Sequence, residues 1–269
     1  MKQIAIYGKG GIGKSSISSN LSVNLASEGY EVLLIGCDPK SDSTINLFEG
    51  RRIDTVLDLY KKGITDPDKL VFEGYNGVKG VEVGGPAAGV GCAGRGILVA
   101  LKTLNKDYYL EKGFDIVIYD VPGDVVCGGF AGPAREGYAD EIYIVTSGEY
   151  LSIYAANNIA KGLFNLKVKM GGIIGNMRGI QKEEEKIQSY AEEIDSQMIK
   201  AVERNPKIYE SEIEGKTVLE KYPNDPLNLK FKEIGEKIFE NKKAKVPNPT
   251  TDEKIRSILG GLYWTYLGS

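Results

Sequence analysis

Near its amino terminus the chain reads Gly8-Lys9-Gly10-Gly11-Ile12-Gly13-Lys14-Ser15, between a short apolar run and a segment with helical spacing. This stretch fits the pattern G-x-x-x-x-G-K-[ST], in which glycines let backbone N–H groups turn toward a polyphosphate. In that pattern Lys14 places a charge beside the β- and γ-phosphates, and the Ser15 hydroxyl is a ligand for Mg²⁺. We therefore expect a phosphate-binding loop (P-loop) between the first strand and the first helix.

A second lysine, Lys9, stands at the start of the same loop. Such a lysine marks the deviant P-loop class, whose members dimerise with nucleotide between the two subunits. In those proteins the first lysine reaches the phosphates bound by the partner. Lys9 therefore predicts a homodimer and is a candidate catalytic residue.

Apolar or β-branched runs alternate with helix-like segments along the chain. The predicted strands are residues 3–7, 32–36, 78–83, 115–119, 141–146 and 171–175, and the longest predicted helices are 16–28, 96–112 and 151–166. Buried runs that alternate with helices indicate βαβ units. We expect a single α/β P-loop NTPase domain with a mostly parallel sheet, helices on both faces and functional loops after the strands. The charged segment 181–193 is interpreted as a solvated helix face.

The carboxyl-terminal part of the chain has a different pattern. We expect the P-loop domain to span residues 1–243, followed by a tail at 244–269 whose first part, 244–251, contains the prolines typical of a linker. An amphipathic helix is predicted over 252–267 from i, i+3, i+4, i+7 spacing. Its apolar stripe is Ile255, Ile258, Leu259, Leu262, Tyr263 and Tyr266. This helix packs on its own domain or contacts a partner or second subunit.

Four aspartates follow predicted strands on the edge that carries the P-loop. Asp120 ends an apolar run and is the expected carboxylate on the Mg²⁺ side. Asp124 is a candidate switch residue that senses or polarises the γ-phosphate and its attacking water. Asp38 and Asp42 are candidates for contacts with Mg²⁺ or water, with a role as turn and N-cap carboxylates as the alternative.

Two cysteines lie in glycine-rich segments that follow strands on the same edge: Cys92 in 84–96 and Cys127 in 123–132. Two thiolates cannot complete the four-cysteine set of a [2Fe–2S] or [4Fe–4S] cluster, but two identical chains related by a two-fold axis can. They are therefore candidate ligands of one cluster shared by two subunits. The third cysteine, Cys37, is interpreted as a small buried packing residue.

Composition excludes several other activities. The 269 residues include no histidine, which rules out histidine-dependent nucleophilic catalysis and histidine-ligated metals in this chain. A formal charge of −3 argues against a nucleic-acid partner. No run approaches the roughly 20 apolar residues of a membrane span. Three cysteines without a signal peptide favour a cytoplasmic protein with reduced thiols.

These segments resemble the nitrogenase iron protein family, ATP-dependent reductases that deliver electrons to a larger metalloprotein. The resemblance runs from Met1 to about Phe239 and covers the P-loop, a first switch at 36–44, cluster loops at 84–96 and 120–130, and the segment 141–159. It implies one [4Fe–4S] cluster per homodimer, MgATP, a larger electron acceptor, and an upstream ferredoxin or flavodoxin.

The resemblance also implies roles for individual residues. Those serving MgATP would be Gly8, Lys9, Gly10, Gly11, Ile12, Gly13, Lys14, Ser15, Ser16, Asp38, Asp42, Asp120 and Asp124. Cys92 and Cys127 would ligate the cluster, Asn176 would contact adenine, and Arg95 would contact the partner protein.

Several residues depart from the family pattern. Pro122 stands where leucine is usual, which implies a stiffer second switch because proline fixes φ and lacks an N–H. Ser16 replaces a threonine, Gly80 stands where many members have a further cysteine, and Glu203 replaces a proline near the base site. We expect a divergent branch of the family.

The sequence therefore predicts an oxidoreductase that couples ATP hydrolysis to electron transfer. Its acceptor would be nitrogenase, or a nitrogenase-like enzyme of tetrapyrrole biosynthesis or sulfur metabolism. A positioning or partitioning P-loop ATPase without redox chemistry is the alternative from another class, although it has no need for Cys92 and Cys127. A cluster scaffold or carrier is the third, although such proteins typically use a Cys-x-x-Cys pair, which this chain lacks.

Overall fold

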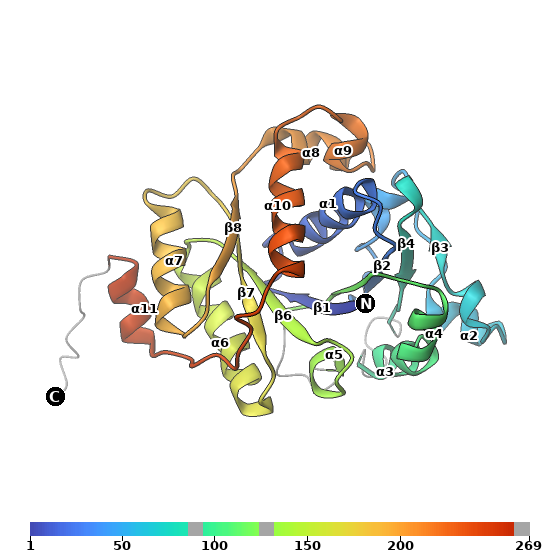
Figure 1. Ribbon diagram of the computed structural model, residues 1–269, viewed down its shortest axis with the longest axis horizontal. Coiled ribbons are helices and arrows are strands. Elements are labelled where there is room, and N and C mark those ends of the chain that lie inside the picture. The colour runs from blue at the N-terminus through green and yellow to red at the C-terminus, as the bar shows by residue number, and fades with distance from the viewer. Residues whose placement is uncertain (86–93, 124–131, 261–269) are drawn as a thin grey trace.

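A central sheet of eight strands organises the computed structural model, which describes residues 1–85, 94–123 and 132–260, without the side chains of 94–96. The strands are β1 (Lys2–Tyr7), β2 (Val32–Gly36), β3 (Phe72–Glu73), β4 (Lys79–Glu82), β5 (Ile116–Asp120), β6 (Glu141–Thr146), β7 (Met170–Asn176) and β8 (Met198–Val202). Their order is β3-β4-β2-β5-β1-β6-β7-β8, and only the β3–β4 pair is antiparallel (Figure 1). β1, which leads into the P-loop, thus lies between β5 and β6.

Helices cover both faces of this sheet (Figure 1). They are α1 (Lys14–Ser27), α2 (Val56–Lys61), α3 (Gly94–Thr103), α4 (Lys106–Glu111), α5 (Gly132–Arg135), α6 (Tyr150–Leu166), α7 (Glu183–Glu193), α8 (Pro206–Ile213), α9 (Val218–Lys221), α10 (Leu227–Phe239) and α11 (Asp252–Ile258), with 3₁₀ turns at Ile45–Leu47, Pro67–Lys69 and Tyr75–Gly77. α1, α9 and α10 pack on one face, and α3, α6 and α7 pack on the other. The predicted α/β fold with a mostly parallel sheet is confirmed.

Alternate side chains of the central strands enter two separate cores. In β1, Ile4 and Ile6 pack in the core that contains α1 and α10, whereas Ala5 and Tyr7 pack in the core that contains α3 and α6. All four side chains are fully buried. A strand buried on both faces is apolar at every position, which is why these strands appear in the sequence as continuous apolar runs. Each buried isoleucine contributes about 1.5–3 kcal/mol.

The structure differs from the predicted elements in several places. The predicted helix 96–112 is two helices, because the Asn105 side chain caps α4 by accepting a hydrogen bond from the Tyr108 N–H at 3.0 Å. The edge strands β3 and β8 are not among the predicted strands. β3 has two residues, and β8 interrupts its apolar pattern with Lys200. α1 begins at Lys14, two residues before the predicted start.

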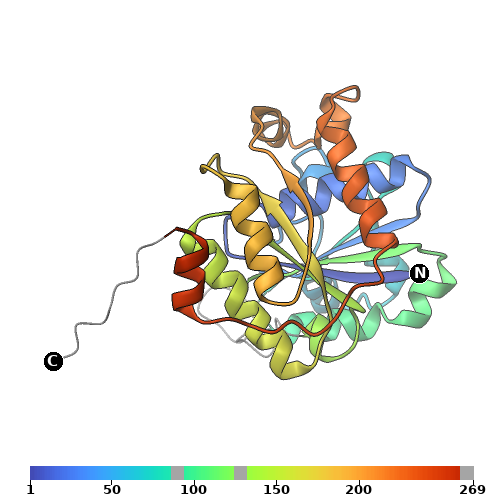
Figure 2. The same cartoon turned by 60° about the vertical axis from the view of Figure 1, so that its left-hand side comes forward.

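The tail packs on the P-loop domain in the part that the structure describes. Met170 of β7 and Lys245 form an isolated antiparallel bridge, and α11 lies beside α6 and α7 (Figure 2). Ile255 is fully buried there, and the Arg256 guanidinium lies 4.3 Å from the Tyr150 ring centroid. α11 ends at Ile258 rather than at residue 267, since Gly260 adopts a φ of +80°. Leu262, Tyr263 and Tyr266 lie outside the described residues, and the division at residues 243 and 244 stays a prediction.

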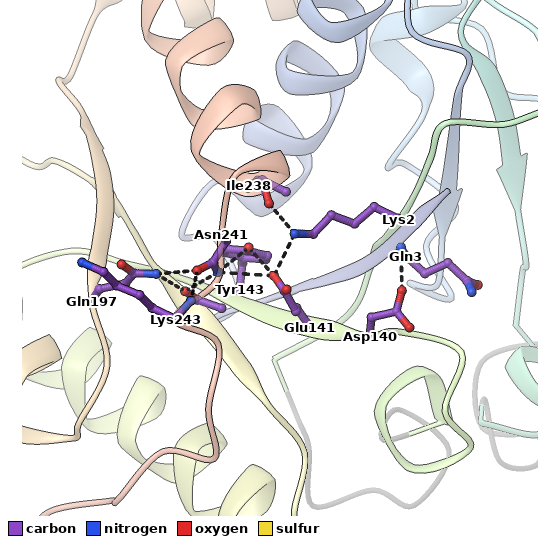
Figure 3. A network of polar contacts seen from close by, with 10 residues as sticks. Lys2, Gln3, Asp140, Glu141, Tyr143, Gln197, Ile238, Asn241 and Lys243 are labelled. Carbon is purple, nitrogen blue, oxygen red and sulfur yellow. Dashed lines mark hydrogen bonds and ion pairs between the residues drawn. The ribbon is translucent and has the colours of Figure 1, made fainter.

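A polar network joins the strands at the edge opposite the P-loop (Figure 3). Lys2 forms an ion pair with Glu141 at 3.2 Å, and the Tyr143 hydroxyl donates to the same carboxylate at 2.6 Å. The Asn241 amide donates to the Tyr143 hydroxyl at 2.9 Å and to the Gly171 carbonyl oxygen at 3.0 Å. These bonds tie the starts of β1, β6 and β7 to the end of α10. The amino-terminal edge of the sheet therefore has a structural role, and the loops at the carboxyl-terminal edge carry the predicted chemistry.

Candidate nucleotide-binding site

The P-loop, residues 8–13, lies against the ends of β6 and β7. A Cβ on Gly8 would lie 2.4 Å from the Val145 carbonyl oxygen, and a Cβ on Gly13 would lie 2.3 Å from the Asn176 amide nitrogen. Gly13 has a φ of +96° and is the N-cap of α1. The loop therefore opens onto a helix amino terminus, whose free N–H groups and dipole favour an anion.

The two lysines of the loop have different environments. The Lys14 side chain is 9% exposed, and its ammonium donates to the Lys9 carbonyl oxygen at 3.5 Å, across the loop. Lys9 itself is exposed. Lys14 is therefore enclosed within the loop of its own subunit, while the side chain of Lys9 is exposed to solvent.

Ser15 and Asp120 come together directly below the loop. The Ser15 hydroxyl donates to Asp120 Oδ2 at 2.5 Å, while Asp120 Oδ1 is buried and has no hydrogen-bond partner among the described residues. Burial raises the pKa of Asp120, an effect that the Lys14 charge and the neighbouring hydroxyls of Ser15 and Ser43 oppose. A carboxylate oxygen without a partner beside a hydroxyl is a donor set that suits Mg²⁺. The site therefore fits the metal expected from the sequence.

Asp38 and Asp42 occupy the loop after β2. Asp38 Oδ1 accepts a hydrogen bond from the Lys40 N–H at 3.0 Å, so the turn role considered from the sequence is present. Burial is the main cause of the raised pKa of Asp120, and the charge of Asp38 adds to it. The two carboxylates are therefore close enough to interact. The charge of Asp42 likewise adds to the rise in the pKa of Glu82 that burial causes. Three aspartates and one glutamate thus gather beside the P-loop.

Glu82, at the end of β4, is a site residue that sequence reasoning missed. It is 1% exposed, and its Oε1 accepts hydrogen bonds from the N–H and hydroxyl of Thr44 at 2.7 and 2.9 Å. Burial raises its pKa to about 8 despite these bonds. A glutamate within the apolar run Val81-Glu82-Val83 was the available signal, because a charge is rarely buried without a specific partner.

The segment after β5 packs directly on the P-loop. A Cβ on Gly123 would lie 2.1 Å from the Gly8 carbonyl oxygen, so only glycine permits this approach. The Cys37 N–H donates to the Asp120 carbonyl oxygen at 2.9 Å, which joins the ends of β2 and β5. Cys37 is fully buried, as predicted, and burial raises the pKa of its thiol, with the Asp120 charge adding to the effect.

The end of β7 supplies two side chains to the P-loop backbone. The Asn176 amide donates to the Ile12 carbonyl oxygen at 2.6 Å, and the Arg178 guanidinium donates to the Gly11 carbonyl oxygen at 2.9 Å. Asn176 therefore lies at the site, although the bond seen is with the loop. Sequence reasoning did not select Arg178, which has no motif of its own.

The segment expected near the nucleotide base lies at the end of β8. Glu203, for which the resemblance implied a proline, pairs with Lys230 of α10 at 3.0 Å. Asp225, Leu227 and Asn205 line a cavity next to this pair. Glu203 therefore takes part in a solvent-exposed ion pair at the end of β8.

Several predicted site residues lie outside the described part of the chain. Asp124, Cys92 and Cys127 are among them. The backbone of Arg95 is part of α3, but its side chain is not among those that the structure describes. Their roles stay predictions.

The fold and the loop geometry together define a P-loop nucleotide-binding protein. The model of the NifH/frxC family of 4Fe-4S iron sulfur cluster binding proteins matches residues 2–264, and the chain belongs to this family. Its cofactors are those expected from the sequence: a [4Fe–4S] cluster that bridges a dimer, and MgATP.

Similar sequences are named nitrogenase iron protein. The chain is 51% identical to "Nitrogenase iron protein 2" of Methanothermobacter thermautotrophicus, over 95% of this chain and 96% of the relative. It is 45% identical to the "Nitrogenase iron protein" of Methanospirillum hungatei, over 96% and 95%. It is 44% identical to "Nitrogenase iron protein 2" of Paenibacillus durus, over 95% and 90%.

Solved structures with a similar fold include proteins of other functions. The MinD cell division protein of Aquifex aeolicus superposes with a TM-score of 0.70 at 18% identity, covering 90% of this chain and 98% of that one. A ParA family ATPase from Chlorobium tepidum gives 0.65 at 19% identity, covering 89% and 100%. Identities this low show a common fold alone. Within residues 1–85, 94–123 and 132–260, no helix has both the length and the apolar character needed to cross a bilayer.

Proposed function

We propose that two copies of this chain form a cytoplasmic, ATP-dependent iron–sulfur reductase that transfers electrons to a nitrogenase-type catalytic partner. Family membership and 44–51% identity to proteins named nitrogenase iron protein support this function. The structural observation that carries it is the Ser15–Asp120 pair, whose second carboxylate oxygen is buried without a hydrogen-bond partner in the described part of the chain, beside a glycine loop at a helix amino terminus. This arrangement suits the triphosphate and Mg²⁺ of MgATP.

Each residue near the loop has a proposed task. Lys14 and the loop N–H groups bind the phosphates, and Ser15 and Asp120 hold Mg²⁺. Lys9 reaches the phosphates bound by the partner subunit. The remaining proposed contacts are Ser16 and Asp42 with the bound MgATP, Asp38 and Asp124 with the attacking water, and Asn176 with adenine.

The proposed cluster ligands are Cys92 and Cys127 from both subunits. The bound cluster supplies one-electron transfer. Asp120 and Cys127 are seven residues apart in the sequence, so their Cα atoms cannot be more than about 25 Å apart. Because Gly123 touches the P-loop at Gly8, a change in loop conformation acts directly on the segment that leads to Cys127.

The cluster is tested by anaerobic purification and visible and electron paramagnetic resonance spectra of the wild type and single cysteine variants. We expect Cys92→Ser and Cys127→Ser to lose the cluster signal. Cys37→Ala, which changes a fully buried cysteine in the core, is the matched control and should keep the signal. A colourless wild-type dimer that still hydrolyses ATP would instead favour the positioning or partitioning ATPase.

The acceptor is tested by an anaerobic pull-down from native lysate in ADP and aluminium fluoride, which traps the docked complex. Recovery of a dinitrogenase-type protein supports the proposal, and loss of that protein with Arg95→Ala would support the proposed docking role of Arg95. Recovery of a tetrapyrrole-type or sulfur-metabolism enzyme would assign the chain to that reductase class. A ferredoxin or flavodoxin is the proposed electron donor.

A further inference from the structure

Two neighbouring carbonyl groups of the P-loop are bound by side chains from the end of β7. Asn176 donates to the Ile12 oxygen at 2.6 Å, and Arg178 donates to the Gly11 oxygen at 2.9 Å. Neither bond involves a group that would contact a phosphate. Both hold a carbonyl oxygen of the loop toward the end of β7.

The backbone that carries Arg178 is fixed by one buried carboxylate. Oε2 of Glu183 accepts hydrogen bonds from the N–H groups of Arg178, Gly179 and Ile180 at 2.9, 2.9 and 3.0 Å. Its Oε1 accepts from the Gly148 N–H at 2.8 Å, which ties the loop after β7 to the loop after β6. Glu183 is 4% exposed, although it begins the helix that the sequence indicated to be a solvated face.

The geometry of the peptide bond explains what these contacts do. In a trans peptide the C=O and the following N–H point in opposite directions. Holding the oxygens of Gly11 and Ile12 toward the end of β7 therefore turns the N–H groups of Ile12 and Gly13 away from it, toward the interior of the loop. The Ile12 N–H is turned across the loop in this way and donates to the Lys9 carbonyl oxygen at 3.1 Å, so the Gly13 N–H is the donor of this pair that the orientation offers to a phosphate. Inward N–H groups are the ones with which a P-loop binds phosphate.

We propose that Arg178 is a positioning residue that sets the peptide orientation of the P-loop for a nucleoside polyphosphate, with Glu183 as its anchor. A charge-assisted hydrogen bond to a carbonyl is stronger than a neutral one, so Arg178 resists rotation of the Gly11–Ile12 peptide more firmly than water would. Lys9 and Lys14, in contrast, are placed to meet the phosphates themselves. The inference rests on the proposed function, because it presumes that this loop binds a nucleotide.

The first test compares the intact holo dimer with Arg178→Ala. Its affinity for a fluorescent ADP analogue should fall about tenfold, the effect of losing one charge-assisted hydrogen bond. Amide hydrogen exchange in the peptide that contains Gly8–Ser15, measured without nucleotide, should become faster. Arg51→Ala removes an exposed arginine paired with Glu49 and controls for the loss of charge.

Chemical rescue separates positioning from general stability. Arg178 is partly exposed, so guanidinium ion in the millimolar range can occupy the space left in Arg178→Ala and should restore affinity, while methylammonium at equal ionic strength should not. Glu183→Gln should reproduce the faster loop exchange, because it removes the carboxylate charge that holds the backbone of residues 178–180. If Arg178→Ala does not fold, Arg178→Gln is measured in the same way.

The outcomes distinguish the two proposals. A wild-type dimer that does not bind the ADP analogue contradicts the proposed function itself. A wild type that binds, together with an Arg178→Ala variant of unchanged affinity and loop exchange, overturns the role of Arg178 and leaves the function in place. Weaker binding that guanidinium does not restore also counts against positioning.

Discussion

Asp120 is a buried carboxyl group with one oxygen bonded to Ser15 and the other without a partner among the described residues. Burial raises its pKa, so the ionised form costs the apo protein stability. A bound divalent cation would offset this cost. The ionised Asp120 side chain therefore lowers the stability of the apo protein and favours the binding of a metal ion. One substitution at this position should change these two properties in opposite directions.

We therefore expect Asp120→Asn to keep or raise the thermal unfolding midpoint without nucleotide. The factor by which Mg²⁺ raises the affinity for ATP should become about 10- to 100-fold smaller, which is the effect of losing a bond to a charged group. Calorimetric titration with ATP, with and without Mg²⁺, measures this effect. Asp107→Asn on the exposed surface of α4 is the control. An Asp120→Asn protein with undiminished Mg²⁺ dependence would exclude Asp120 from the metal site.

Glu82 makes the stability of the protein depend on pH in an unusual direction. Its ordinary pKa is 4.5, and burial raises the pKa to about 8 in the folded chain, with Asp120 and Asp42 acting in the same direction. Between these values the folded state holds a proton that the unfolded state has released. The free energy of unfolding should therefore decrease as pH rises from about 5 to 8, by up to about 1.4 kcal/mol per pH unit.

Urea unfolding of the wild type and Glu82→Gln across this pH range tests the prediction. Glutamine is neutral at every pH, so the variant should lack the Glu82 part of the slope and should exceed the wild type most at the alkaline end. Glu73→Gln on the neighbouring β3, where the side chain is exposed, should follow the wild-type curve. Parallel curves for wild type and Glu82→Gln would show that Glu82 does not titrate in this window.

The site was predictable from sequence where a motif fixes the geometry. Gly8–Ser15 and the carboxylate at the end of β5 carry their role in residue type and spacing, and the structure brings Ser15 and Asp120 together. Glu183 could not be found in this way, since its bonds are to backbone N–H groups and nothing in the run Glu183-Glu184-Glu185 distinguishes the buried member. Arg178 depends in turn on that anchored backbone.

Elements were predictable where burial is strong on both faces. The predicted bounds of β2 and β6 are those of the structure, because each is fully or almost fully buried. Local hydrogen bonding explains the error in the helix predicted at 96–112, where Asn105 starts a second helix within a helical pattern. In the edge strand β8 buried residues alternate with the half-buried Met198 and Lys200, so its apolar pattern is interrupted and harder to recognise.

α11 tests whether the tail is part of the cooperative unit. Ile255 is fully buried against α6 and α7, and truncating a buried isoleucine to alanine costs about 2–5 kcal/mol. If the tail unfolds with the domain, Ile255→Ala should lower the global free energy of unfolding by that amount, measured in urea. Ser257→Ala, an exposed position of the same helix, should change it little.

The alternative outcome has its own signature. A tail that is an appendage to residues 1–243 would leave the global transition unchanged in Ile255→Ala, with faster hydrogen exchange confined to α11 and the faces of α6 and α7 beneath it. That result would support the predicted division of the chain at residue 243.

The two edges of the sheet have different roles: one is structural, and the other carries the proposed nucleotide site. An ion pair at Glu141 and hydrogen bonds donated by the Asn241 amide stabilise the amino-terminal edge. The P-loop, the acidic residues and the starts of both predicted cluster loops lie at the carboxyl-terminal edge. A single chain presents half of the proposed machinery there. A second copy would complete it, with Lys9 exposed at the boundary and Lys14 enclosed in its own loop.

The different burial of these lysines predicts different phenotypes. Lys14→Ala should weaken MgATP binding strongly, because the buried ammonium lies across the loop that is proposed to bind the phosphates of its own subunit. Lys9→Ala should change the affinity by no more than about fivefold, as expected for an exposed charge. If ATP closes the proposed dimer, small-angle X-ray scattering should show a more compact wild type with ATP, and Lys9→Ala should abolish this change. Lys61→Ala, at an exposed position of α2, is the control for charge. Equal losses of affinity in Lys9→Ala and Lys14→Ala would place both lysines in one subunit's site, and normal compaction of Lys9→Ala would contradict its reach across the dimer.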